Sequence, residues 1–458
     1  MFLRQYDLAC LSLYSYLIGD TGTGRAVVVD PQRDIGEYLA DAAANGLRIE
    51  RILQTHFHAD YVSGQLELAA ATGAPISYGD AATADFPIEP LGHGQQLSLG
   101  EVTLEIRHTP GHTPESISIV VREAPDAEPA AVLTGDTLFI GDVGRPDLLA
   151  SAGRTAHSLA RDLHRSLHEQ LLTLPDHTLV YPAHGAGSAC GKHLSAAASS
   201  TIGEQRSTNY ALQPMTEDRF VDVVTEGQAA APAYFAFAAD ANRRRHGLLD
   251  DHEAPATLLI DDALRLRAGG AALLDTRPPE SFASGHLLGS LNVGLDGRFA
   301  EYAGDVLRPD QEIVLIGDPG RGTEAKVRLA RIGFDRVAGE LSEVELVLAA
   351  RPELAGVASR VPAADVARWI EQDDDLQIVD VRNPGEVAVT GAVPGARPLP
   401  LAVLLDHLDE LDRERPTVVY CAGGYRSSIA ASALRAHGFG TVADISGGFG
   451  AWASVAAG

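Results

Sequence analysis

A repeat inside the chain constrains its fold more than any other feature. The residues 273–278, LLDTRP, return in similar form at 378–383 as IVDVRN, an offset of 105 residues (378 − 273). In each copy an apolar strand runs into an Asp-x-Arg turn, a loop with Gly285 or Gly391 follows, and then come a β-rich strand and an Ala-rich helix. Strands that alternate with helices are typical of α/β domains with a parallel sheet. The repeat therefore predicts two such domains of about 100 residues each.

The rest of the chain lacks this repeat, and composition marks where the parts join. An Ala-rich stretch at 229–239 precedes a highly charged one at 242–251, and a second join lies between 355 and 362. A chain of 458 residues also accommodates roughly three domains. We expect their boundaries at 1–245, 246–355 and 358–458.

The charge balance bears on the partners of the protein. Lys and Arg number 36 against 62 Asp and Glu, a net charge of −26 (36 − 62), which repels nucleic-acid phosphates and anionic lipids. No apolar run approaches the roughly 20 residues of a membrane helix. Three cysteines are too few for a disulfide framework and favour a reducing compartment. We expect a cytoplasmic protein without nucleic-acid or membrane partners, and whether it forms a homo-oligomer stays open.

Two β-rich runs open the chain. Residues 8–18, LACLSLYSYLI, and 25–29, RAVVV, flank a Gly-rich turn. Both runs are expected to be strands, with Cys10 a structural residue inside the first.

Histidines and aspartates follow four strand-like runs in the first part of the chain. The loop at 56–61, HFHADY, comes after the apolar run 51–53, and His112, Asp136 and His184 each follow another such run. Four strand ends can converge on one pocket, where imidazoles and carboxylates are metal ligands. The pattern predicts a metal site.

These residues resemble the metallo-β-lactamase superfamily, whose pattern is HxHxDH followed by separate His, Asp and His ligands. The resemblance covers roughly residues 1–240 and implies an αββα sandwich. The last His of HxHxDH is Tyr61 in this chain. In the dinuclear hydrolases of the fold that His helps to hold a second metal ion, and a phenol with a pKa near ~10 is a poor substitute. A second zinc ion is therefore disfavoured.

The side chains that remain predict a mononuclear site. His56, His112 and Asp136 form a set of two imidazoles and one carboxylate, whose open positions suit ferrous iron and oxygen chemistry. We therefore expect one Fe(II) per chain. Four other side chains are expected to orient these ligands or the substrate: His58, Asp60, Tyr61 and His184.

The phrase at 135–147, GDTLFIGDVGRPD, narrows the resemblance. It is similar to the persulfide dioxygenase branch of the superfamily, which is related to glyoxalase II and in which iron oxidises a thiol persulfide to sulfite. The resemblance implies that Arg145 lies near the substrate, and a structural salt bridge is the alternative. Cys190 is either a persulfide relay or a buried structural residue.

A second candidate site lies at 417–428, TVVYCAGGYRSS. Its strand, Gly-rich loop and helix surround the Cys421 thiol with backbone N–H groups, which lower a thiol pKa and can hold anionic sulfur. The loop resembles the active-site loop of rhodaneses, and the likeness extends over 360–455. Its six residues suit sulfur transfer, whereas related phosphatases use one residue more. The resemblance implies catalytic roles for Cys421 and Arg426 and substrate binding by Gly423, Gly424 and Tyr425.

The first repeat carries no such nucleophile. The offset of 105 residues puts Ile316 at the position of Cys421. An alkyl side chain cannot form a persulfide, so residues 246–355 are expected to be a rhodanese-like domain without the catalytic Cys. Its expected role is to pack between the outer domains or to shape access to them.

Together the two resemblances predict a fusion enzyme of sulfide detoxification. An αββα domain would use iron and O₂ to oxidise a low-molecular-weight thiol persulfide to sulfite, and an α/β rhodanese domain would transfer sulfur and give thiosulfate. The identity of the thiol stays open. One alternative is a zinc thioester hydrolase of the glyoxalase II type with a sulfurtransferase tail. The other is a non-catalytic persulfide carrier or sensor in which Cys421 only stores sulfur.

Overall fold

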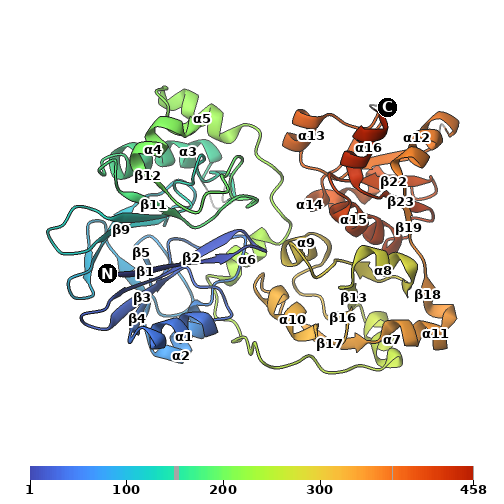
Figure 1. Cartoon of the computed structure of the whole chain (residues 1–458), viewed down its shortest axis with the longest axis horizontal. Coiled ribbons are helices and arrows are strands. Elements are labelled where there is room, and N and C mark those ends of the chain that lie inside the picture. Colours follow the sequence, from blue (N-terminus) through green and yellow to red (C-terminus); the bar gives the residue numbers. More distant parts are fainter. Residues whose placement is uncertain (149–153, 374, 457–458) are drawn as a thin grey trace. The chain divides into compact units, whose positions relative to one another are not determined.

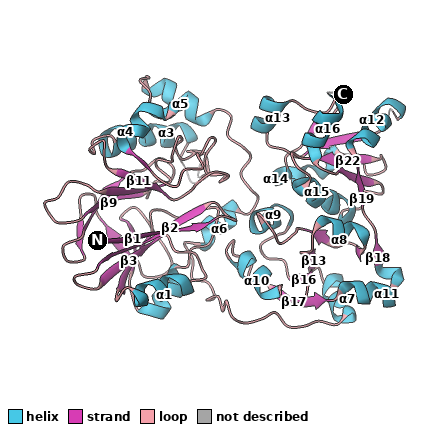
Figure 2. Cartoon of the chain, viewed as in Figure 1, coloured by secondary structure: helices cyan, strands magenta, loops and turns pink. Residues whose placement is uncertain are grey.

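The computed structural model describes residues 1–148, 154–373 and 375–456. The chain divides into two compact units (Figure 1): residues 1–228 with 235–249, and residues 229–234 with 250–458. Both units combine strands and helices (Figure 2). Among the helices that the structure describes, none is both long and apolar enough to cross a membrane.

The first unit is built on two six-stranded sheets. In spatial order the first sheet contains β1 (Phe2–Leu8), β2 (Leu13–Asp20), β3 (Arg25–Val29), β4 (Arg48–Leu53), β5 (Ile76–Gly79) and β6 (Glu89–Leu91). The second contains β12 (Ser200–Thr201), β11 (Leu179–Pro182), β10 (Ala131–Gly135), β9 (Ile117–Arg122), β8 (Thr103–His108) and β7 (Gln96–Ser98). Most of these strands are rich in Val, Ile, Leu or Tyr, which favour a pleated, buried surface.

Helices cover the outer face of each sheet. Figure 1 shows α1 (Gly36–Ala44) and α2 (Gln65–Thr72) outside the first sheet. Outside the second lie α3 (Ala156–Arg165) with the π-helical turn Ser166–Leu171, α4 (Ile202–Thr208), the 3₁₀ turn Tyr210–Leu212 and α5 (Glu217–Thr225). One apolar core fills the space between the sheets, and two more lie beneath the helices. This confirms the predicted αββα sandwich. The last helix of this unit along the chain is α6 (Phe235–Ala241), in the segment 235–249.

The N-terminal strands differ from the prediction in one respect. The run 8–18 was expected to be one strand, but the chain turns at residues 9–12, between β1 and β2. Cys10 lies in this turn, so the prediction that it sits inside a strand is wrong. The turn needs the left-handed backbone of Ser12, with φ of 53°, and it pairs β1 with β2 as an antiparallel hairpin. The strand predicted at 25–29 is confirmed as β3.

The second unit contains two parallel sheets, as predicted. The first has the order β15 (Leu291–Asn292), β13 (Ala272–Asp275), β16 (Ile313–Gly317), β17 (Val337–Ser342). The second has the order β19 (Ser359–Val361), β23 (Val442–Ile445), β22 (Thr417–Tyr420), β20 (Gln377–Asp380), β21 (Arg397–Pro398). A small antiparallel pair joins β14 (His286–Leu287) to β18 (Ala355–Gly356).

Helices surround both of these sheets. Around the first are α7 (Ile260–Ala268), α8 (Pro279–Ser284), α9 (Phe299–Val306), α10 (Gly322–Ala330), α11 (Val344–Ala350) and the 3₁₀ turn Pro352–Leu354. Around the second are α12 (Ala363–Gln372), α13 (Pro384–Thr390), α14 (Leu401–Leu404) with the 3₁₀ turn Leu405–Glu410, α15 (Tyr425–Ala436) and α16 (Gly448–Ala456). Each sheet has its own apolar core.

The repeated Asp-x-Arg motif is a buried ion pair in both halves of the unit. Arg277 Nη2 donates to Asp275 Oδ2 at 2.6 Å, and Arg382 Nη2 donates to Asp380 Oδ2 at the same distance. The same nitrogens also donate to carbonyl oxygens of the glycine loops, at Gly285 and Gly391 respectively. The motif therefore fixes the loop that follows each strand, because a buried guanidinium needs partners for all of its donors.

The strand register corrects the predicted equivalence of the two halves. Asp275 pairs with Ile316 on the neighbouring strand, whereas the matching Asp380 pairs with Tyr420 rather than Cys421. The connection between the two strands is one residue longer in the first half, so the residue that corresponds to Cys421 is Gly317. Ile316 is instead a buried core residue of β16. Neither Ile316 nor Gly317 has a nucleophilic side chain, so the first half lacks the nucleophile whichever residue is matched with Cys421.

His286 makes the stability of the second unit depend on pH. Its ring stacks on Phe282 with 3.9 Å between ring centres, and its Nδ1 donates to the Phe282 carbonyl. Burial lowers the pKa of His286 to about 4, aided by Arg435 and Arg277 and opposed by that hydrogen bond. The unfolded chain binds this proton near pH 6.5, so the contribution of the neutral ring is present above pH 6.5 and is lost as the pH falls toward 4.

We predict that His286→Asn is less stable than wild type by about 1 kcal/mol at pH 7.5 and that this deficit shrinks as the pH falls to 4.5. Asn keeps a donor for the Phe282 carbonyl but has no proton to gain. Both tryptophans, Trp369 and Trp452, lie in the second unit, so their fluorescence during urea unfolding reports on it. The exposed His252→Asn is the control. A deficit that stays constant with pH would contradict the prediction.

Candidate metal centre and sulfur-transfer loop

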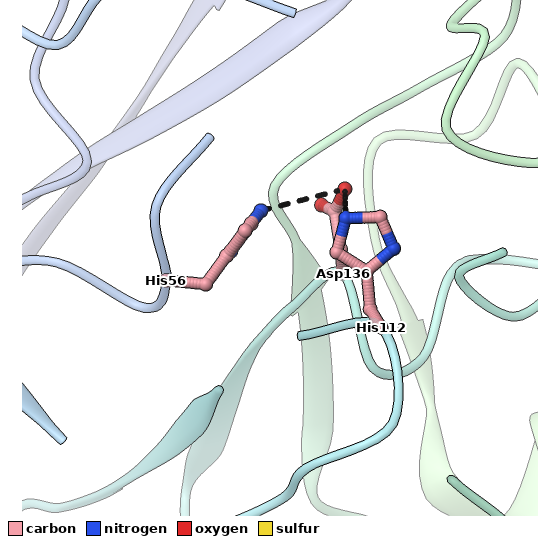
Figure 3. A group of neighbouring side chains, drawn as sticks. All are labelled: His56, His112 and Asp136. Carbon is pink, nitrogen blue, oxygen red and sulfur yellow. Dashed lines mark ion pairs between the residues drawn. The ribbon is translucent and has the colours of Figure 1, made fainter. Parts of the chain in front are cut away.

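Three strand ends bring a potential metal-binding set together in the first unit. His56 follows β4, His112 follows β8 and Asp136 follows β10. Asp136 Oδ2 lies 3.7 Å from His56 Nε2 and 3.4 Å from His112 Nε2. Figure 3 shows both imidazoles pointing at this carboxylate. The three groups could thus share one ion, and all three side chains are almost fully buried.

Hydrogen bonds fix the tautomer of His56. The Thr55 hydroxyl donates its one hydrogen to Asp30 Oδ2, 2.8 Å away, because a carboxylate only accepts. Thr55 Oγ1 must then accept from His56 Nδ1, at 2.9 Å. Burial, together with the neighbouring His58, lowers the pKa of His56 well below its usual value. The ring is therefore neutral, and its Nε2 lone pair faces Asp136.

The tautomer of His112 follows from a backbone contact. Its Nδ1 lies 2.8 Å from the carbonyl oxygen of Arg145, which cannot donate, so Nδ1 carries the proton. In the neutral form of the ring, the lone pair is then on His112 Nε2. Gly144, the residue before Arg145, allows the close approach: a Cβ there would lie 1.9 Å from the Asp136 carbonyl oxygen and 3.2 Å from His112 Cβ.

His184 holds the carboxylate of Asp136 in place. Its Nδ1 lies 2.7 Å from Asp136 Oδ1, and its Nε2 lies 2.7 Å from Asp60 Oδ2. Although burial disfavours its charge, these two carboxylates raise the pKa of His184 well above its usual value. Burial likewise opposes the charge of Asp136, but His184 and His56 lower its pKa. An imidazolium between two carboxylates thus leaves Asp136 Oδ2 directed at His56 and His112.

His58 and Tyr61 line the same region. His58 Nε2 lies 3.2 Å from Asp30 Oδ1, and its ring is tilted against that of Tyr61 with 4.5 Å between centres. The Tyr61 hydroxyl donates to the Asp30 carbonyl at 3.1 Å. Burial raises the pKa of Tyr61 well above its usual value, so the side chain is a neutral phenol. His58, Asp60 and His184 still form a second group whose ligand atoms lie within 4.8 Å of one another.

Two positioning residues were missed by the sequence analysis. Asp30 links Thr55 and His58, and it adopts an unusual backbone with φ of 52°. Asn242, near the C-terminal end of the unit in sequence, donates to the carbonyls of His58 and Tyr61, both at 2.8 Å. It therefore holds the loop at 56–61, called the metal loop below, in place. The Asp-Pro pair that follows β3 was a usable signal for Asp30. Nothing in the local sequence marks Asn242, because its partners are distant in the chain.

Arg145 and Cys190 both lie beside the metal centre. The Arg145 guanidinium makes a bidentate ion pair with Asp147, with two bonds of 2.7 Å, and it also donates to the Ala189 carbonyl. Cys190 offers a sulfur within 4.8 Å of ligand atoms of Asp136 and His184. Burial raises the pKa of Cys190 well above its usual value, and the nearby carboxylates act in the same direction.

The polar atoms of this centre fit a metal ion. His56 Nε2 and Asp136 Oδ2 are buried and have no hydrogen-bond partner within residues 1–148, 154–373 and 375–456. Leaving such atoms unpaired costs about 1–3 kcal/mol each. Two imidazole nitrogens and one carboxylate oxygen are donor types that divalent transition metals bind. Ligation would therefore satisfy the atoms that the protein leaves without partners.

The candidate sulfur-transfer loop lies at the end of β22 in the second unit. Cys421 is buried, and its Sγ accepts a hydrogen bond from Gly424 N at 3.1 Å. Ser427 Oγ lies 3.7 Å from the same sulfur. Of the predicted ring of backbone N–H groups, Gly424 thus contacts the sulfur directly, and Gly423 is exposed in the loop. Gly424, with φ of 101°, precedes the first residue of α15.

The remaining loop residues are held by neighbours. Arg426 makes a bidentate ion pair with Glu386 of α13, with bonds of 2.7 and 2.6 Å. Tyr425 donates through its hydroxyl to the Gly294 carbonyl. The backbone of Gly448 packs under Cys421, where a Cβ would lie 2.4 Å from the Cys421 carbonyl oxygen. The second candidate site is therefore fixed on several sides before any substrate binds.

Comparison with known proteins assigns both parts of the chain. Residues 10–184 match the model of the metallo-beta-lactamase superfamily, and residues 260–341 and 362–455 match the rhodanese-like domain. The chain is 32% identical over 248 residues to the mitochondrial persulfide dioxygenase ETHE1 of Bos taurus, covering 53% of this chain and 88% of that protein. The Homo sapiens protein of the same name is 31% identical with the same coverage.

A solved structure resembles a larger part of the molecule. It is a metallo-beta-lactamase from Staphylococcus aureus subsp. aureus COL, 34% identical, with a TM-score of 0.68 over 74% of this chain and 98% of that one. The chain belongs to the metallo-β-lactamase superfamily. Within it, the chain has persulfide dioxygenases among its relatives and carries a pair of rhodanese-like domains, which confirms the predicted fusion architecture.

We predict that Gly144→Ala weakens metal binding at least tenfold, because the new Cβ displaces the Asp136 backbone and the support of His112. Gly36→Ala is the matched control, since a Cβ at Gly36 meets nothing within 4 Å. Titration of each metal-free protein with Fe(II) or Zn(II) against a competing chelator measures the affinity. Equal affinities of Gly144→Ala and wild type, with both folded by circular dichroism, would contradict the prediction.

Proposed function

We propose that the chain is an iron-dependent persulfide dioxygenase joined to a sulfurtransferase. The first unit would convert a low-molecular-weight thiol persulfide, RSSH, with O₂ and water into RSH, sulfite and two protons. The observation that supports this proposal is a set of two imidazoles and one carboxylate, in which hydrogen bonds hold His56 Nε2, His112 Nε2 and Asp136 Oδ2 toward one another. The names of the relatives supply the substrate class.

The donor set favours one ferrous ion over two zinc ions. His56, His112 and Asp136 would hold the ion, leaving positions for O₂ and substrate. Tyr61 stands where dinuclear relatives have a histidine, and its neutral hydroxyl is engaged with the Asp30 carbonyl. When bound, ferrous iron would supply the redox chemistry that joins oxygen to the terminal sulfur of the persulfide.

The residues around the ligands would keep the centre rigid during turnover. Thr55 and Asp30 hold the His56 ring, and the Arg145 carbonyl holds His112. His184 balances the charge of Asp136 and Asp60 in a buried region where an unpaired carboxylate is costly. The Cys190 sulfur lies within 4.8 Å of ligand atoms of Asp136 and His184, but its burial favours the protonated thiol, which is a poor nucleophile.

The second unit would use the sulfite. A persulfidated Cys421 would give its outer sulfur to sulfite: the sulfite sulfur attacks, a new S–S bond forms, and the old one breaks with its electron pair on the Cys421 thiolate. Cys–S–S⁻ and SO₃²⁻ thus become Cys–S⁻ and S₂O₃²⁻. The Gly424 N–H would stabilise the anionic sulfur, and Arg426 would attract the oxyanion.

A zinc thioester hydrolase is the second candidate for the first unit. The observation in its favour is the group of His58, Asp60 and His184, which could hold a second ion beside the first. Against it, His184 is already engaged with two carboxylates and Tyr61 offers no imidazole. Metal content and product analysis separate the two functions.

We predict one iron per chain after anaerobic purification of the wild type. His112→Ala should lose the iron, and its persulfide-dependent oxygen uptake should fall at least 100-fold. The exposed His177→Ala is the control and retains both. Metal analysis and an oxygen electrode make the measurement. Two tightly bound zinc ions with thioesterase activity and no oxygen uptake would reject the dioxygenase and favour the hydrolase.

We predict that Cys421→Ser abolishes sulfur transfer but leaves oxygen uptake largely unchanged, because a serine hydroxyl is protonated at neutral pH and forms no persulfide. Given only persulfide and O₂, wild type should accumulate thiosulfate, whereas Cys421→Ser should accumulate sulfite. Cys10→Ser, which removes a thiol in the β1–β2 turn, controls for the loss of a sulfur atom. Sulfite as the sole product of the wild type would refute the coupled reaction. If Cys421→Ser transferred sulfur at the normal rate, another thiol would carry the persulfide sulfur, and Cys190 would be the first to test.

A further inference from the structure

A cavity opens beside α2 in the first unit, and none of the residues that line it belongs to the candidate metal centre. Its volume of about 420 Å³ lies within the roughly 300–1,000 Å³ of sites that bind small molecules. Side chains of α2, of β5 and of the loop after β5 form its apolar walls: Leu66, Ala69, Ala70, Ile76, Phe86 and Pro87. These walls favour a molecule with an apolar body, because binding removes apolar surface from water on both sides.

The remaining wall comes from the segment 242–249, which is fixed to the body of the unit. Three of its side chains line the cavity: Arg245, His246 and Leu248. The buried Arg33 donates from Nη2 to the Gly247 carbonyl at 2.9 Å. Leu249 N donates to Glu67 Oε1 at 3.2 Å. Arg33 and Glu67 also form a buried ion pair of 2.9 Å. The segment is therefore held in place as a wall before any ligand binds.

His246 presents an unsatisfied polar atom in the lining of the cavity. Its Nδ1 lies 3.0 Å from the carbonyl oxygen of Gly247, which cannot donate, so Nδ1 carries the proton. Its Nε2 is buried and has no hydrogen-bond partner in the described part of the chain. A buried polar atom without a partner is costly. A molecule that fills the cavity, or a water molecule beside it, can supply the missing partner.

Arg245 supplies a positive charge that the described residues do not neutralise. Asp85 Oδ1 accepts from Arg245 N at 2.6 Å, and so holds the backbone of this residue. No hydrogen bond or ion pair joins the Arg245 guanidinium to any residue within 1–148, 154–373 and 375–456. The two arginines before it are engaged: Arg244 pairs with Asp240 at 3.1 Å, and Arg243 lies over an aromatic ring. The charge of Arg245 is thus available to an anion in the cavity.

We propose that this cavity binds a small carboxylate with an unbranched apolar chain. The chain lies between α2 and Phe86, and the carboxylate pairs with Arg245, whose planar guanidinium matches it with two parallel hydrogen bonds. The protein as a whole repels anions, with a net charge of −26, so a free guanidinium beside apolar walls selects an anion that also has an apolar body. This inference goes beyond the proposed function, because no candidate metal ligand and no residue of the sulfur-transfer loop lines the cavity.

The charge is tested by titrating the full-length chain with decanoate, below its critical micelle concentration, in a calorimeter. We expect one decanoate per chain and an affinity that falls about threefold or more in Arg245→Gln. Arg244→Gln is the matched control, because it removes the same charge one residue away and should leave the affinity unchanged. Decanol has the same chain without the charge, so wild type and Arg245→Gln should bind it equally.

The cavity itself is tested by filling it. Ala70 lines the cavity, whereas the next residue of α2, Ala71, does not, and both side chains are exposed. Ala70→Leu should therefore weaken decanoate and decanol alike, by about threefold or more, while Ala71→Leu should bind both as wild type does. Circular dichroism verifies that each variant is folded.

Four results would overturn the proposal. The first is a wild-type chain that does not bind decanoate. The second is an equal loss of affinity in Arg244→Gln and Arg245→Gln, which would reflect the general charge of the surface. The third is unchanged binding in Ala70→Leu, which would place the ligand elsewhere. The fourth is a change of oligomeric state in Ala70→Leu, by light scattering, without decanoate binding to the wild type. That result would assign the cavity to a contact between two copies of the chain.

Discussion

The buried carboxylate of Asp136 is the group on which the first unit depends. A carboxylate out of contact with water is costly unless charged and hydrogen-bonded neighbours compensate it. His184 supplies that compensation on one oxygen, and this leaves the other oxygen toward His56 and His112. The neighbouring imidazoles in turn owe their free lone pairs to groups that can only accept, the Asp30 carboxylate and the Arg145 carbonyl. The geometry of the candidate ligand set is thus a consequence of its hydrogen-bonding surroundings.

The second unit uses ionic contacts for a different purpose. Its Asp–Arg pairs, 275 with 277 and 380 with 382, are bidentate and buried, and each guanidinium also binds a loop carbonyl. These pairs hold loops rather than ligands. In one half the sheet so formed presents Cys421, and in the other it presents Gly317. The shared framework explains why the fold survives where the nucleophile is absent.

Much of the fold and of the candidate metal centre could be predicted from the sequence, because the patterns that indicate them lie within short stretches of the chain. The strands that precede His56, His112 and Asp136 are apolar runs followed by polar loops. The repeated Asp-x-Arg turns indicate two related sheets. The register at Gly317 could not be predicted, because a single extra residue in a connection shifts a strand without changing its pattern. Cys10 was misplaced because an apolar run of eleven residues hides a tight turn. Asn242 escaped because its contacts join residues that are far apart in the chain.

The position of Asn242 also has a consequence for how the protein is made. The side chain that clamps the metal loop follows His58 by 184 residues, and it is translated after every candidate ligand. While a nascent chain leaves the ribosome, its imidazoles are therefore exposed long before the residue that fixes them has been added. Domains fold as units as they are synthesised, so the centre reaches its final geometry only when the last helix of the first unit has docked. We therefore expect an ion to enter this centre only late in biosynthesis.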